Sequence, residues 1–111
     1  MAADFTIKAH DTEPSIQATL SSGGSPINLV GATVKFIMAD KATGAVKVNA
    51  AAVIVDAAAG IVRYDWLSTD SATAASYQAE WQITDSGGGI RTVPTTTYIT
   101  VDVLADLDGG I

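Results

Sequence analysis

The clearest pattern in this sequence is a strict alternation of apolar and polar residues over residues 77–84. The apolar series Tyr77, Ala79, Trp81 and Ile83 is interleaved with Gln78, Glu80, Gln82 and Thr84. A period of two predicts a β-strand with one face buried and the other face exposed to water. The same alternation predicts further strands at residues 5–8, 15–20, 33–39, 46–55 (one or two strands, broken near residues 49–50), 61–66, 90–94 and 95–104.

Between these segments lie short stretches rich in Gly, Pro, Asp and Ser, which are typical of turns. No segment shows a helical period. We therefore expect an all-β protein of seven to nine short strands arranged as a two-sheet antiparallel sandwich. A chain of 111 residues matches one domain, so we expect residues 1–111 to form a single domain with short flexible termini.

Five large side chains fall on inward positions of the predicted strands, and we expect them to form the structural core: Phe36, Tyr64, Trp66, Tyr77 and Trp81. The segment Asp70-Ser71-Ala72 leads into Tyr77, an arrangement similar to the tyrosine corner of immunoglobulin domains. We therefore predict that Tyr77 is buried, with its hydroxyl group bonded to the backbone within residues 70–74.

Composition and charge exclude several classes of function. The chain has no cysteine, which excludes disulfides, thiolate zinc sites and thiol nucleophiles. The net charge of −6 argues against nucleic-acid binding, which needs clustered Lys and Arg. Apolar runs are far too short for a membrane span, and the first residues show no signal-peptide pattern, so we expect a product made in the cytoplasm without membrane contact.

Candidate catalytic and cofactor-binding residues are few. His10 with Asp11 and Glu13 is the only histidine cluster, but no Ser or Cys signature accompanies it, so we interpret it as a loop histidine. The glycine-rich residues 23–24 and 87–89 lack the strand-to-helix setting of a phosphate loop and are interpreted as hairpin loops. We predict no enzyme activity and no cofactor.

Two groups of acidic residues also fail to indicate chemistry. The sequence Asp106-x-Asp108-Gly109 is a fragment of a calcium-loop pattern without the later ligand positions. Asp65 and Glu80 occupy outward strand positions, where a solvated surface is the usual role of a carboxylate. We therefore predict no metal site.

The threonine-rich segment near the end of the sequence allows two interpretations. It pairs within its own sheet, or it offers an exposed edge to which a partner adds a strand. The candidate residues for such a partner edge are Thr95, Thr96, Thr97 and Tyr98.

Several motifs together resemble the immunoglobulin-like domain of the phage baseplate upper protein family. The opening I-K-x-x-D-T-x-P is present at residues 7–14, and L-x-G-A-T-V-x-F is present at residues 29–36. The motifs G-x-V-x-Y-x-W and Y-x-A-E-W follow at residues 60–66 and 77–81. The resemblance covers most of the chain and implies an immunoglobulin-like antiparallel β-sandwich.

The resemblance also implies a function. Members of this family are non-enzymatic virion structural proteins, so we expect a baseplate, tail or head accessory subunit located in the virion. Its partners would be other virion proteins, or further copies of itself in a symmetric assembly. Two alternatives stay open: a stand-alone capsid decoration protein, and an immunoglobulin-like module that binds carbohydrate or a cell surface. For the second alternative, Tyr98 and Phe5 are the candidate aromatic contacts.

Overall fold

The computed structural model of the protein describes residues 4–94 and 98–105. Within these residues the chain forms eleven β-strands and no helix, which confirms the predicted all-β class. None of the described residues forms a helix able to cross a membrane. The strands are β1 (Phe5–Lys8), β2 (Ile16–Thr19), β3 (Ser21–Ser22), β4 (Ser25–Pro26), β5 (Thr33–Asp40), β6 (Val46–Ala51), β7 (Val53–Asp56), β8 (Ile61–Tyr64), β9 (Ala75–Thr84), β10 (Ile90–Val93) and β11 (Ile99–Leu104).

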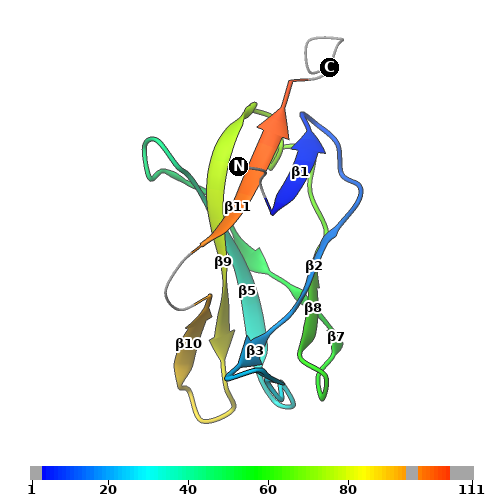
Figure 1. Ribbon diagram of the computed structural model, residues 1–111, viewed down its shortest axis with the longest axis vertical. Helices are drawn as coiled ribbons and strands as arrows, with labels where there is room; N and C mark the ends of the chain where they lie inside the picture. Colours follow the sequence, from blue (N-terminus) through cyan, green and yellow to red (C-terminus); the bar gives the residue numbers. More distant parts are fainter. Residues whose placement is uncertain (1–3, 95–97, 106–111) are drawn as a thin grey trace.

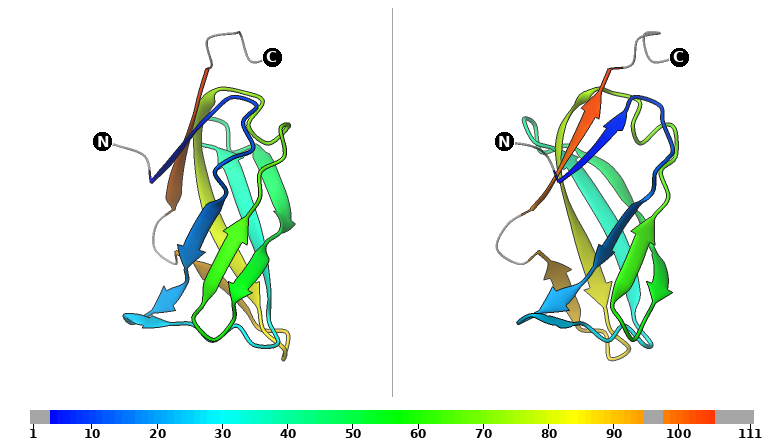
Figure 2. Two further views of the ribbon diagram at one scale, coloured as in Figure 1. Left: turned by 90° about the vertical axis from the view of Figure 1, so that its right-hand side faces the viewer. Right: turned by 45° about the vertical axis from the view of Figure 1, so that its right-hand side comes forward.

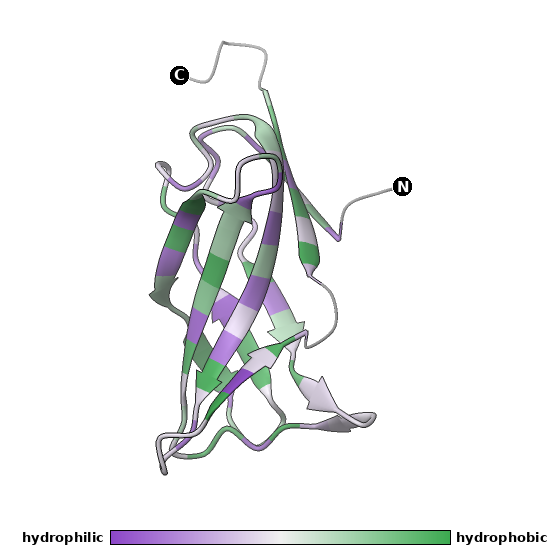
Figure 3. Cartoon of the chain, turned by 90° about the vertical axis from the view of Figure 1, so that its left-hand side faces the viewer, coloured by the Kyte–Doolittle hydropathy of each residue, from purple (hydrophilic) through white to green (hydrophobic). Residues whose placement is uncertain are grey.

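Two sheets face each other around one core (Figure 1). The larger sheet has the order β1-β11-β9-β5-β6, with β10 also paired to β9, and the smaller sheet has the order β2-β8-β7. β3 and β4 form a separate short hairpin. Figure 2 shows the smaller sheet lying across one face of the larger sheet. The opposite face of the larger sheet is visible in Figure 3, where apolar and polar bands alternate along the strands as the period of two requires.

The central strand of the larger sheet is β9, the strand with the clearest alternation in the sequence. β5 pairs with one edge of β9 over eight residues. On the other edge, β11 pairs with the first half of β9 and β10 pairs with the second half. Every other residue of β9 from Tyr77 to Ile83 is therefore buried, as the pattern predicts.

Four aromatic side chains, Phe36, Tyr64, Trp66 and Trp81, form one cluster between the two sheets. The ring of Phe36 lies 4.9 Å from the ring of Tyr64, 5.5 Å from Trp66 and 4.9 Å from Trp81, measured between centroids. These separations are typical of favourable aromatic pairs. The indole N–H groups of Trp66 and Trp81 are buried and have no hydrogen-bond partner among the described residues. The two indole rings are therefore held by packing and not by polar contacts.

At the turn before β8, the backbone of Gly60 lies close to the backbone of Leu20 and Ile27. Gly60 has a φ of +70°, and a side chain there would lie 2.7 Å from the carbonyl oxygen of Leu20 and 2.8 Å from that of Ile27. Only glycine accepts both the positive φ and this close backbone approach. The packing at Gly60 holds the chain at Ile27 against the end of the sandwich.

The structure corrects three details of the predicted architecture. The number of strands is higher than seven to nine because the predicted hairpin loop at residues 21–26 contains two short strands, β3 and β4, on either side of its turn. Residues 46–55 form two strands, which is one of the two arrangements expected for them. The break between those two strands falls at Ala52, whose N–H group donates to the carbonyl of Val34, and not near residues 49–50. Alanine is small and occurs at both buried and exposed positions. The apolar–polar alternation therefore did not show where the chain passes from one sheet to the other.

The third correction concerns strand direction. β1 pairs with β11 in parallel, so the larger sheet is not purely antiparallel. The chain leaves β1 at His10, which has a φ of +67° and donates its N–H group to the carbonyl of Ser71, and then crosses to the smaller sheet. Apolar periodicity reports which face of a strand is buried but not the direction of its neighbour.

Candidate functional site

One end of the sandwich, at the top of Figure 1, is closed by hydrogen bonds among buried groups; we call it the upper pole and define it as Tyr64, residues 67–73 and Tyr77. The carboxylate of Asp70, only 8% exposed, accepts a hydrogen bond from the Tyr64 hydroxyl group at 2.5 Å and one from the Leu67 N–H group at 2.8 Å. The buried Ser71 hydroxyl group donates to the carbonyl of Asp11 at 2.9 Å. The polar groups that this end buries are thus bonded within the fold.

The prediction for Tyr77 is confirmed. Tyr77 is buried, and its hydroxyl group donates to the carbonyl oxygen of Thr73 at 2.8 Å. Burial raises the pKa of Tyr77, and the nearby carboxylate of Asp40 raises it further. The pKa of Tyr64 is also raised, first by burial and then by its hydrogen bond to Asp70. Both shifts mark these hydroxyl groups as structural donors.

The five side chains expected in the core are all buried, with exposed fractions from 0% for Phe36 to 4% for Tyr64. Trp66 lies beyond the end of β8, yet it still reaches the core. Its ring packs between Phe36 and Phe5, the latter at a centroid distance of 5.6 Å. One face of the partly buried Phe5 ring is therefore packed against the core.

The residues considered for chemistry lie at exposed or partly exposed positions. His10, Asp11 and Glu13 are exposed on the crossing from β1 to β2, and the described residues contain no group of His, Cys, Asp and Glu side chains arranged to hold a metal ion. Asp65 accepts hydrogen bonds from Ser15 at 2.7 Å and from Arg63 at 2.8 Å, and these bonds lower its pKa. The fragment at residues 106–109 lies outside the described residues.

The described part of the threonine-rich segment is not a free edge. β11 is flanked by β9 on one side and by β1 on the other, and Thr100 accepts a hydrogen bond from the Asp4 N–H group at 3.0 Å. For Ile99–Leu104 the simpler interpretation, pairing within its own sheet, is therefore the one observed. Of the candidate edge residues, Thr95, Thr96 and Thr97 lie outside the described residues.

Tyr98, the remaining candidate edge residue, is half exposed, with 51% of its surface accessible. It borders a shallow recess of about 280 Å³ on the outer face of the larger sheet. The recess also carries side chains able to form hydrogen bonds, including Gln78, Glu80 and Lys41.

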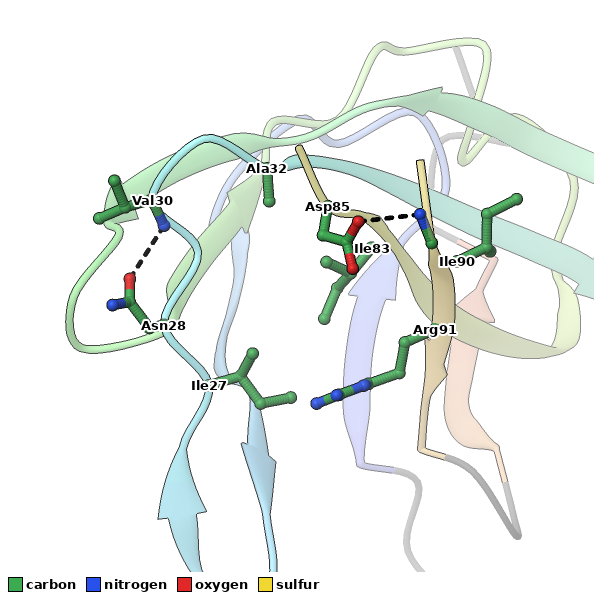
Figure 4. Close-up of a pocket in the computed structure, with 9 residues that line it drawn as sticks. Ile27, Asn28, Val30, Ala32, Ile83, Asp85, Ile90 and Arg91 are labelled. Carbon is green, nitrogen blue, oxygen red and sulfur yellow. Dashed lines mark hydrogen bonds between the residues drawn. The ribbon is translucent and has the colours of Figure 1, made fainter. Parts of the chain in front are cut away.

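A second recess lies at the opposite end of the sandwich, which we call the lower pole and define as residues 27–32 and 83–91. It has a volume of about 240 Å³ and is lined by Ile27, Asn28, Val30, Ala32, Ile83, Asp85, Gly89, Ile90 and Arg91. Figure 4 shows these residues converging from two segments, the chain before β5 and the hairpin between β9 and β10. The buried Ile83 contributes to its lining, while Val30 and Ile90 remain 69% and 67% exposed.

The two charged residues of this recess have different surroundings. Oδ1 of Asp85 accepts hydrogen bonds from the N–H groups of Gly87 at 3.0 Å and Gly89 at 2.8 Å, so its carboxylate holds the hairpin turn. Arg91 has no ion-pair or hydrogen-bond partner among the described residues. In Figure 4 its side chain extends across the recess toward Ile27. The other arginine, Arg63, pairs with Asp65.

The sequence analysis did not identify this recess. The loop at residues 87–89 was correctly interpreted as a hairpin, but its neighbours Asp85 and Arg91 were not considered. The feature of the sequence that could have indicated the recess is the presence of two large apolar residues, Val30 and Ile90, directly beside glycine-containing loops. Exposed apolar side chains grouped around a free cation are typical of protein contact surfaces.

Comparisons with known proteins agree with the all-β architecture of this chain. Residues 3–111 match the family described as the BppU N-terminal domain. Among solved structures, the fold is similar to the "N-terminal domain of phage TP901-1 ORF48" with a TM-score of 0.62 and 18% sequence identity, over 92% of this chain and 83% of that chain. No curated protein matches the sequence. Because the family match spans nearly the whole chain, this protein belongs to the BppU N-terminal domain family, the N-terminal domains of phage baseplate upper proteins.

Proposed function

We propose that this protein is a non-enzymatic structural subunit of a phage baseplate, present in several copies, which acts by burying its surface against other virion proteins. The family match over residues 3–111 carries the proposal. A baseplate component assembles with other virion proteins and is part of the virion.

The two poles support a division of roles within such a subunit. At the upper pole, buried carboxylate and hydroxyl groups bond to one another and stabilise the fold. At the lower pole, Val30, Ile90 and Arg91 remain available on the surface. Arginine and large apolar residues carry much of the binding free energy in protein interfaces. The lower pole is the surface that we propose for partner contact.

We propose further that residues 1–111 act as one domain. The two sheets contribute to a single hydrophobic cluster, which contains Ile16 and Val62 from the smaller sheet and Phe36 and Trp81 from the larger sheet. Removing either sheet would expose the other half of that cluster, so neither sheet is expected to fold alone.

The test is the composition of purified phage particles. Mass spectrometry of virions should detect the protein at a fixed multiple of the tail-tip proteins, and cryo-electron microscopy should place its sandwich in the baseplate. Absence from purified particles would refute the structural role. Density at the capsid surface would instead support the decoration alternative.

A second candidate function is carbohydrate binding at the recess beside Tyr98. A half-exposed aromatic ring next to Gln78, Glu80 and Lys41 combines a stacking surface with hydrogen-bonding groups, as sugar-binding sites do. A glycan array with the purified chain tests this, with Tyr98→Ala as the paired variant. Binding that survives Tyr98→Ala, or no binding by either chain, would exclude it.

A further inference from the structure

The lower-pole recess combines two features that together specify a ligand. Arg91 offers a guanidinium group without a partner among the described residues. Beside it, Ile27, Ile83 and Ile90 offer apolar surface. A partner that fits must bring a carboxylate and a branched apolar side chain within a few residues of each other.

Asp85 also lines the recess, and its charge has to be considered. One carboxylate oxygen accepts two backbone N–H groups of its own turn, which satisfies part of its negative charge locally. Arg91 pairs in register with Ile83 of β9, whereas Asp85 lies in the turn that follows β9, and no ion pair joins the two charged side chains. The guanidinium group therefore stays available to an outside carboxylate.

The chain itself contains a segment with this chemistry. Residues 106–108 read Asp-Leu-Asp, so a leucine is flanked on both sides by carboxylates. No other leucine in the sequence has an acidic residue on both sides. In a chain of net charge −6, a recess whose arginine has no partner within residues 4–94 and 98–105 is the electrostatic complement of such a segment.

The segment cannot reach the recess of its own molecule. On β9, Val103 pairs with Ala75, whereas Arg91 pairs with Ile83, eight residues further along the strand. Eight strand residues span about 26 Å. Leu107 is three residues beyond the end of β11 at Leu104, which allows a reach of at most about 10 Å. Any occupant with this sequence must therefore come from a second molecule.

We propose that the lower-pole recess binds residues 106–108 of a second copy of this chain, with Arg91 contacting the Asp106 or Asp108 carboxylate and Leu107 covering Ile83 and Ile90. The contact joins the lower pole of one copy to the opposite end of the next. Such a head-to-tail contact closes into a ring when the rotation between copies permits. This inference rests on the proposed multi-copy function and names the surface and segment involved.

The test measures binding of a fluorescent peptide of residues 104–111 to the purified full chain by anisotropy. Arg91→Glu should weaken binding by at least about tenfold, because it replaces an attraction with a repulsion worth more than about 1.4 kcal/mol. Lys35→Glu is the matched control, because it makes the same change of charge at an exposed position on the outer face of the larger sheet. Circular dichroism should show the same folded state for all three chains.

A second experiment exchanges the charges of the two partners. A peptide with Asp106→Lys and Asp108→Lys should bind Arg91→Glu better than it binds the unchanged chain. Equal peptide binding by the unchanged chain and Arg91→Glu, or no binding by either, would overturn the proposal.

The proposed function can fail separately from this inference. If another virion protein binds through Arg91 while the peptide does not bind, the assignment of the occupant is wrong and the structural role stands. If the protein is absent from virions while the peptide still binds through Arg91, the self-contact stands and the structural role in the virion is wrong.

Discussion

The two poles of this sandwich lie at opposite ends of the same strand, β9. They differ in whether their polar side chains are buried and bonded within the fold or exposed on the surface. At the upper pole Asp70 is buried and accepts bonds from a tyrosine hydroxyl and a backbone N–H group. At the lower pole Asp85 accepts two backbone N–H groups on the exposed surface, and Arg91 has no partner among the described residues. Polar groups that a fold satisfies internally stabilise that fold, whereas unsatisfied ones at a surface remain available to a partner.

The comparison also separates two roles for large apolar residues. In the core, Trp81 and Phe36 are almost completely removed from water. At the lower pole, Val30 and Ile90 are about two-thirds exposed and contribute little to folding, although they are comparable in hydrophobicity to core residues. The following predictions test this contrast, in order of decreasing expected effect.

Trp81→Ala should have the largest effect because it removes the side chain that fills the core between the poles. Burial of about 200 Å² at roughly 25 cal/mol per Å² gives an upper limit near 5 kcal/mol, so we expect a loss of about 3–5 kcal/mol in the free energy of unfolding. Urea denaturation measures it. Gln82→Ala, the outward-facing neighbour, is the control and should change stability by less than about 0.5 kcal/mol. A similar effect of both substitutions would contradict the described register.

Asp70→Ala should cost about 2–3 kcal/mol because it leaves the Tyr64 hydroxyl group and the Leu67 N–H group without their acceptor in a buried site. Asp85→Ala also removes an acceptor of two bonds, but from an exposed turn, and should cost less than about 1 kcal/mol. Thermal unfolding of both variants measures the contrast between the poles. Equal losses would show that the upper pole is not stabilised by burial of its polar groups.

Alkaline pH should weaken the upper pole. Because burial and the hydrogen bond to Asp70 raise the pKa of Tyr64 above 10.0, the unfolded chain loses this proton more readily than the folded chain. The stability from this group is therefore complete below about pH 10 and is lost as the pH rises above it. Urea titrations at increasing pH should show a decline that is smaller in Tyr64→Phe, and an unchanged decline would contradict the assignment.

Tyr77→Phe should cost about 1 kcal/mol because it removes the hydrogen bond to the Thr73 carbonyl without opening a cavity. The measurement is again the midpoint of chemical denaturation, with Tyr98→Phe on the exposed surface as the control. A loss no larger than that of Tyr98→Phe would show that the corner contributes no stability.

Val30→Ser and Ile90→Ser should have the smallest effect on folding, within about 0.5 kcal/mol of the unchanged chain, because both side chains are already exposed. Differential scanning calorimetry measures this, and analytical ultracentrifugation of the same samples measures assembly. A large loss of stability would mean that the lower pole belongs to the core and not to a contact surface.

Much of the fold was predictable because its signal lies in neighbouring residues. The alternation around Trp81 identifies the strand and its buried face, since successive side chains point to opposite faces. The tyrosine corner was also predictable from a short segment, Asp70 to Tyr77. Its hydrogen bond, from the Tyr77 hydroxyl group to the Thr73 carbonyl, joins residues only four apart in the chain. The role of Asp70 as the acceptor for Tyr64 was not predicted, because nothing in the pattern identifies a buried carboxylate.

The sequence by itself determined which large apolar residues are buried, among them Phe36 and Trp81, and the class of fold they form. The tertiary structure alone decided that β1 runs parallel to β11, which removes the free edge from the described part of the threonine-rich segment. It also decided that Ile27 and Val30 meet Ile83 and Arg91 at one pole. The physical reason is that periodicity records the environment of each residue along its own strand, whereas a recess is made by segments far apart in the chain that only packing brings together.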